Sequence, residues 1–142
     1  MNATNSPSRS FTRFLPTIAR WVLGLPLLVF GLNGFLNFIP PPEKPLPPGA
    51  AAFAGALFAS GYMMQLIGAT QLLTGLALVT NRFVPLGLAL FAPFVVNSVA
   101  FHLRLEHSGL PMALVFAALE LYLAWSYRRA FQPMLAARVT PT

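Results

Sequence analysis

Long stretches without a charged side chain dominate the amino-acid sequence. Apart from Glu120 in the last of them, four such stretches of 21 to 37 residues cover positions 21–42, 45–81, 83–103 and 107–127. A bilayer core about 30 Å thick is crossed by about 20 apolar residues in a helix. A segment that faces lipid must be helical, because only a helix satisfies its backbone hydrogen bonds internally. The pattern therefore predicts an all-α protein with membrane spans at residues 17–39, 62–80, 84–103 and 110–127.

The stretch between the first and second spans is too long for one span. Six of the nine residues at positions 40–48 are proline, which excludes a helix and favours a stiff extended strap. Residues 49–60 predict a short interfacial helix, or alternatively the start of one long tilted helix continuous with the second span. The connections at 81–83 and 104–109 are short, so consecutive spans should pack as antiparallel neighbours. The expected architecture is a transmembrane, up-down four-helix bundle.

The composition agrees with a membrane protein and narrows its chemistry. Charged residues make up 8% of the chain, against about 25% in a soluble domain, and hydrophobic residues make up 56%. The 142 residues include no Cys, which excludes disulfide bonds, Cys-ligated metals and thiol chemistry by the chain itself. Because the chain has two His and no Asp, it offers few ligands for a transition metal, and no metal site is predicted.

Positive charges gather on one side of the predicted spans. That side has seven arginines: Arg9, Arg13, Arg20, Arg82, Arg128, Arg129 and Arg138. The other side has Lys44 and Arg104, each close to a Glu, and Arg104 is expected to pair with Glu106 at the rim. The positive-inside rule then predicts cytoplasmic termini, with tails at residues 1–16 and 132–142. This placement accounts for the net charge of +6 without a nucleic-acid partner.

Polar side chains within the apolar spans are the candidates for function. Counted inward at about 1.5 Å per residue, one polar residue from each span falls within a layer about 6 Å thick near mid-membrane. The four are Asn33, Gln71, Asn97 and Glu120, and Asn37 and His102 lie nearer the outer surface. We predict that these six residues line a ligand-binding site that opens outward. The alternative is that the amides only bridge helices through hydrogen bonds.

Glu120 is the one acidic residue inside a span, and it is the first candidate for catalysis. An ionised carboxylate near the bilayer centre costs several kcal/mol unless it is paired. No Lys or Arg lies at its depth, so we expect a protonated, hydrogen-bonded carboxyl or a functional role. His102 is the second candidate. Ser98 and His102 are four residues apart and share a helical face, which Glu106 continues.

Four segments after Arg20 carry a resemblance to a known family: LVFGLNGFLNFIPPP, GATQLLTGLALVTNRFVPLGLALFAP, FHL and ALELYLAWSYRRAF. Together they resemble the DoxX-like family of small bacterial membrane proteins. The resemblance covers most of the chain and implies a four-span fold in the bacterial cytoplasmic (inner) membrane. DoxX-like proteins typically have a Glu-x-x-x-Gly pattern in the second span, and Gln71 stands at the acidic position here, with Gly75 after it. We hypothesise that Glu120 takes over the role of the missing acid.

Some DoxX-like proteins are linked to thiosulfate:quinone oxidoreduction, or to thiol and oxidative-stress complexes. The resemblance and the polar residues favour an accessory or ligand-binding membrane protein that holds a quinone or another hydrophobic ligand. The alternatives are a membrane subunit of a sulfur-donor:quinone oxidoreductase and a small channel or transporter. Whether the chain is an enzyme stays open. The expected partners are the lipid bilayer and either a further copy of the chain or a redox partner subunit.

Overall fold

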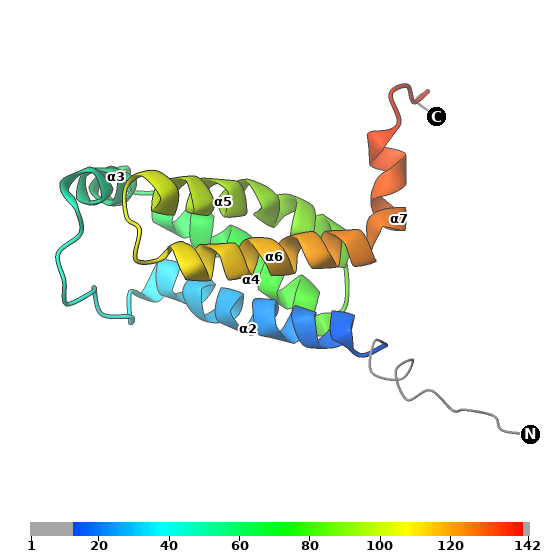
Figure 1. The fold of residues 1–142 in the computed structure, drawn as a ribbon, viewed down its shortest axis with the longest axis horizontal. Helices are drawn as coiled ribbons and strands as arrows, with labels where there is room; N and C mark the ends of the chain where they lie inside the picture. The colour runs from blue at the N-terminus through cyan, green and yellow to red at the C-terminus, as the bar shows by residue number, and fades with distance from the viewer. Residues whose placement is uncertain (1–12, 141–142) are drawn as a thin grey trace, which may run out of the picture.

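The computed structural model describes residues 13–140, most of which are helical (Figure 1). The helices are α2 (Leu15–Leu36), α3 (Pro48–Ala59), α4 (Met63–Thr80), α5 (Val84–Arg104), α6 (Leu110–Ser126), α7 (Arg128–Phe131) and a final 3-10 helix (Gln132–Leu135). Among the described residues there is no strand, so the predicted all-α class is confirmed.

The four long helices lie side by side, and each runs opposite to the next one along the chain (Figure 1). α2 packs against α4 and α6, and α5 packs against the same two helices. α3 contacts α4 and lies at the end remote from the described termini. The long helices therefore enclose one shared interior, in which Leu23, Leu78 and Phe91 are fully buried.

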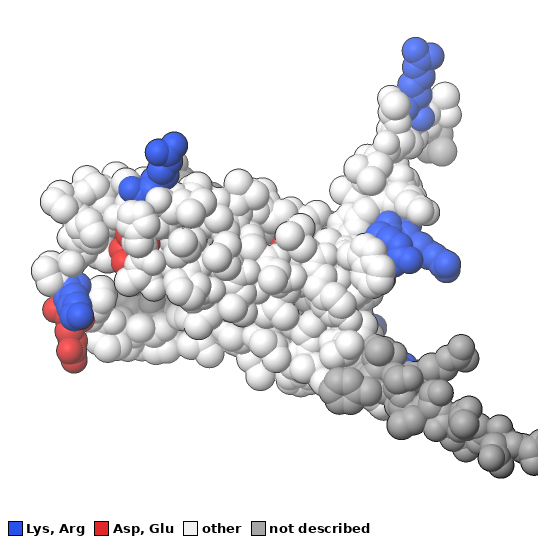
Figure 2. Space-filling model, in the orientation of Figure 1, with Lys and Arg blue, Asp and Glu red and all other residues white. Residues whose placement is uncertain are grey.

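The lengths and apolar faces of these helices are compatible with a membrane-spanning protein. α2, α4 and α5 are each long and apolar enough to cross a membrane. α6 meets the same criterion only together with the segment Arg128–Leu135, which is bent from it by 76°. Large side chains such as Leu73, Val96 and Leu121 are exposed. Figure 2 shows a long uncharged surface between charged groups near its two ends, as the sequence led us to expect.

The first long helix ends earlier than the sequence pattern predicts. α2 stops at Leu36 rather than at residue 39, because Asn37 adopts a left-handed backbone conformation with φ of 50°. The side-chain oxygen of Asn33 accepts a hydrogen bond from the backbone N–H of Ile39 at 2.7 Å. This bond supplies a partner for a backbone group beyond the helix end and fixes the path of the chain as it leaves α2.

α3 and α4 are two separate helices, not one long tilted helix. The chain breaks between them at Gly61, which has φ of 76°, a value that favours glycine. The Ser60 hydroxyl oxygen accepts a hydrogen bond from the backbone N–H of Met63 at 3.0 Å, at the start of α4.

At the other end of the chain, residues 132–135 form a 3-10 helix in the segment expected to be a tail.

Glycines allow α2 and α4 to approach at backbone distance. A Cβ atom added to Gly68 of α4 would lie 2.7 Å from the carbonyl oxygen of Gly31 and 3.2 Å from the Cα of Gly34, both on α2. Neither contact could be relieved by a side-chain rotation, because both neighbours are backbone atoms. Small residues at such crossings are typical of helices that associate in lipid, where close van der Waals packing drives association.

We therefore expect Gly68→Ala to destabilise the fold by about 1–3 kcal/mol, as an overpacked core position does. Thermal unfolding of the purified protein in a mild detergent measures the loss. Gly55→Ala is the matched control, because a Cβ on Gly55 of α3 would meet nothing within 4 Å. Equal midpoints for Gly68→Ala and the unsubstituted protein would contradict the close contact of α2 with α4.

Candidate functional site

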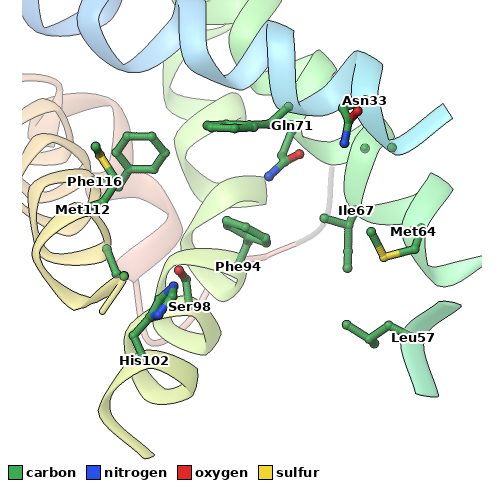
Figure 3. A pocket seen from close by; sticks show the side chains of 15 residues that line it. Asn33, Leu57, Met64, Ile67, Gln71, Phe94, Ser98, His102, Met112 and Phe116 are labelled. Carbon is green, nitrogen blue, oxygen red and sulfur yellow. The ribbon is translucent and has the colours of Figure 1, made fainter. Parts of the chain in front are cut away.

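A cavity of about 490 Å³ lies among the four long helices, at the end where α3 packs (Figure 3). Most of its wall is apolar, with Phe94 of α5 and Phe116 of α6 among the lining side chains. Leu57 of α3 lines it as well. Concave, mainly apolar sites of about 300–1,000 Å³ with a few polar groups are typical of small-molecule binding. This cavity is therefore the candidate site.

Four polar side chains reach the cavity from three helices: Asn33, Gln71, Ser98 and His102. Figure 3 shows the amides of Asn33 and Gln71 directed into the space, with Ser98 and His102 next to each other on α5. Because the Asn33 oxygen already accepts the hydrogen bond from Ile39, its amide nitrogen is the group left as a donor. The Gln71 residue is only 7% exposed, so its amide is held within the helix packing.

His102 is fixed by the turn that joins α5 to α6. Its Nδ1 lies 2.8 Å from the backbone carbonyl oxygen of Glu106 and 3.0 Å from the carboxylate atom Oε2 of the same residue. The second carboxylate oxygen accepts hydrogen bonds from the hydroxyl and the backbone N–H of Ser108, the latter at 2.8 Å. The backbone N–H of Gly109 donates to Oε2 at 2.9 Å. Glu106 thus joins the end of α5 to the start of α6.

These donors keep Glu106 ionised. The hydroxyl of Ser108 and the backbone N–H groups of Gly109 and Ser108 lower the pKa of the Glu106 carboxyl from its usual 4.5 to about 2. The predicted pairing of Glu106 with Arg104 is wrong, because the carboxylate is turned toward His102 and the following turn. Arg104 is the last residue of α5 and is exposed.

The structure brings together only three of the six residues that the sequence assigned to one site. Asn33, Gln71 and His102 line the cavity. Asn97 is exposed and lines a separate hollow of about 470 Å³ beside α3 and α4, because helix geometry turns it about 140° from His102. Asn37 lies beyond the end of α2, is exposed, and does not line the cavity.

Glu120 also lies outside the cavity. It is one helical turn beyond Phe116 on α6 and lines a smaller apolar hollow of about 300 Å³ between α5 and α6. The residue is 5% exposed, and its Oε2 atom has no hydrogen-bond partner among the described residues. The expected hydrogen bonds from neighbouring amides to this oxygen are absent within residues 13–140.

Arg20 is a buried charge that the sequence did not reveal. The sequence places it among the seven arginines of the predicted cytoplasmic side, yet it is 7% exposed inside the helix packing. One guanidinium nitrogen donates to the carbonyl oxygen of Leu78 and another to the Thr17 hydroxyl, both at 3.4 Å, and its Nε is unpaired among the described residues. The sequence signal for this burial was the position of Arg20 inside the first helix, where it is the sixth residue of α2.

Comparison of the chain with protein-family models, curated proteins and solved structures found no match. Within residues 13–140 no group of three His, Cys, Asp or Glu side chains is placed to hold a metal ion. The functional interpretation therefore depends on the cavity and the residues around it.

The low pKa of Glu106 makes the turn at 105–109 sensitive to acid. A carboxyl whose pKa falls on folding stabilises the folded state above its ordinary pKa, and this stabilisation is lost as the pH falls toward the folded value. The difference in melting temperature between the unsubstituted protein and Glu106→Gln should therefore shrink as the pH falls from 4.5 to about 2. Thermal unfolding in an acid-stable detergent measures it.

Glu43→Gln is the control for this titration, because Glu43 is exposed on the loop between α2 and α3. It should follow the unsubstituted protein at every pH. A difference between Glu106→Gln and the unsubstituted protein that persists undiminished to pH 2 would contradict the role of the ionised carboxylate.

Proposed function

We propose that the chain is an integral membrane protein in which α2, α4, α5 and α6 cross the bilayer as an up-down four-helix bundle. Three of these helices are long enough alone, and α6 is antiparallel to α5 and packed against it. The exposed side chains of the long helices include Val22, Leu66 and Leu121, which suit lipid contact. In this arrangement α3 lies at the membrane interface, beside the entrance of the cavity.

The proposed orientation places both termini in the cytoplasm. Arg13, Arg82, Arg128 and Arg129 lie at the ends of helices near the described termini, whereas the opposite end has Lys44 and Arg104. Such an excess of arginine marks the cytoplasmic side of a membrane protein. Together with the resemblance to DoxX-like proteins, this supports the bacterial cytoplasmic (inner) membrane as the location, with the cavity facing outward.

Cysteine labelling tests this orientation, because the chain has no Cys of its own. A membrane-impermeant maleimide should label Ser60→Cys, at the end of α3, in intact spheroplasts. It should label Ala137→Cys only after the membrane is permeabilised. Both positions are exposed in the structure, so a difference in labelling would come from the membrane barrier and not from burial. The reverse labelling pattern would contradict the orientation.

We further propose that the cavity binds a quinone or a similar hydrophobic ligand that carries a polar ring. The single observation that carries this proposal is a space of about 490 Å³ with apolar walls and converging groups from Asn33, Gln71 and His102. An amide N–H of Asn33 or Gln71 can donate a hydrogen bond to a ring carbonyl oxygen. Phe94 and Phe116 provide flat apolar surfaces for the ring itself.

Binding of decylubiquinone to the purified protein in a mild detergent tests the proposal. Gln71→Leu should weaken binding about five- to tenfold, because it removes one hydrogen bond and leaves the volume nearly unchanged. Glu120→Gln should leave the affinity unchanged, since Glu120 lines a different hollow. Empty micelles measure nonspecific partition. Absence of binding above that background, or equal loss in both variants, would contradict the proposal.

A further inference from the structure

We propose that His102, positioned by Glu106, selects ligands that present a hydroxyl group, so that the cavity binds the quinol (phenol-type) form of a ring in preference to the quinone form. The inference rests on the proposed binding function and adds to it the chemical class of the favoured ligand. It follows from the hydrogen bonds of one imidazole ring.

The two neighbours of Nδ1 decide which nitrogen of His102 carries a hydrogen. Nδ1 lies within hydrogen-bond distance of the carbonyl oxygen of Glu106 and of its carboxylate atom Oε2, at 2.8 and 3.0 Å. Both atoms are acceptors, since the carboxylate is held ionised by donors from Ser108 and Gly109. Nδ1 must therefore be the protonated nitrogen. In the neutral ring Nε2 then has a free lone pair.

Nε2 is accordingly the ring nitrogen available to a ligand in the cavity that His102 lines. A lone pair accepts a hydrogen bond from a hydroxyl group and repels the lone pairs of a carbonyl oxygen. The carboxylate of Glu106 polarises the ring and makes Nε2 a better acceptor. The amide of Gln71 can donate or accept according to its orientation, so it serves either ligand form. Discrimination between the two forms therefore comes from His102.

Gly109 packs closely against the imidazole ring of His102. A Cβ atom at Gly109 would overlap the ring atoms of His102, although the backbone φ of −83° at this position is open to any residue. Gly109→Ala should therefore displace the imidazole without removing a polar group or straining the turn. Glu106 and Gly109 are positioning residues, and they act on the ligand through His102.

The test compares the affinities of decylubiquinol and decylubiquinone, measured anaerobically in the same detergent. The unsubstituted protein should bind the quinol about tenfold more tightly. In His102→Ala and Gly109→Ala the ratio of the two affinities should approach one, and in Glu106→Gln it should fall. The ratio separates selection from general damage to the fold, which would weaken both ligands equally. Glu43→Gln and Gly55→Ala are the matched controls and should keep the ratio.

Nitrogen-15 NMR of histidine-labelled protein gives an independent readout. The His102 signals should show the Nδ1–H tautomer, with exposed His107 as the internal reference. A quinol-to-quinone ratio near one in the unsubstituted protein would overturn the inference while leaving the binding proposal intact. A ratio unchanged in Glu106→Gln and Gly109→Ala would overturn the positioning roles. Failure of both ligands to bind would overturn the proposed function itself.

Discussion

The backbone contact between α2 and α4 is the constraint on which the rest of the structure depends. In lipid, apolar side chains gain little by leaving their surroundings, so helices are held by close packing and interhelical hydrogen bonds. Gly31, Gly34 and Gly68 provide that packing. Asn33 lies between the two glycines of α2, and Gln71 lies three residues after Gly68. The contact that joins the helices therefore also sets the positions of two amides on one side of the cavity.

The opposite side of the cavity is held in place by the turn between α5 and α6. One carboxylate, that of Glu106, accepts hydrogen bonds from Ser108, Gly109 and His102 and so joins the end of α5 to the start of α6. The backbone N–H groups at the start of a helix have no partner within the helix. The Glu106 carboxylate accepts hydrogen bonds from the backbone N–H groups of Ser108 and Gly109, the two residues before α6. A turn of five residues thus fixes a ring that lines the site. The hydrogen bonds that stabilise this turn therefore also position the imidazole ring that lines the cavity.

Much of the helical layout could be predicted from charge spacing, because about 20 apolar residues in a row have few alternatives in a membrane. The depth of each polar residue in the membrane could also be counted from its position in the span, and this count placed Asn97 and Glu120 level with Gln71. Counting also gives the angle between two residues of one helix, such as Asn97 and His102, but it does not say which face of the helix meets the interior. Asn97 points away from the cavity and Glu120 lies a turn deeper beside α5, because the rotation of each helix is set by packing across neighbours distant in sequence.

The errors at charged positions have a common cause. Arg104 and Glu106 are close in sequence, yet the helix end places the carboxylate against His102 instead. Arg20 belongs by sequence to the arginines that orient the chain, but its long side chain lies in the packed interior and reaches the carbonyl oxygen of Leu78. Hydrophobic patterning places backbone segments, whereas the direction of a long polar side chain depends on which unsatisfied backbone groups lie within its reach.

The position of the cavity within the helices bears on the choice between binding and transport. Toward the described termini the interior is filled by Leu23, Leu27, Leu78, Phe91 and Leu123, each of which is fully buried. Among residues 13–140, such close-packed layers leave no continuous space from the cavity to the other end. A single copy of this fold therefore has space for a ligand at one end of the bundle, and its described interior shows no path to the other end. This arrangement fits the proposed binding site better than a channel, because conduction would need a pathway formed between copies.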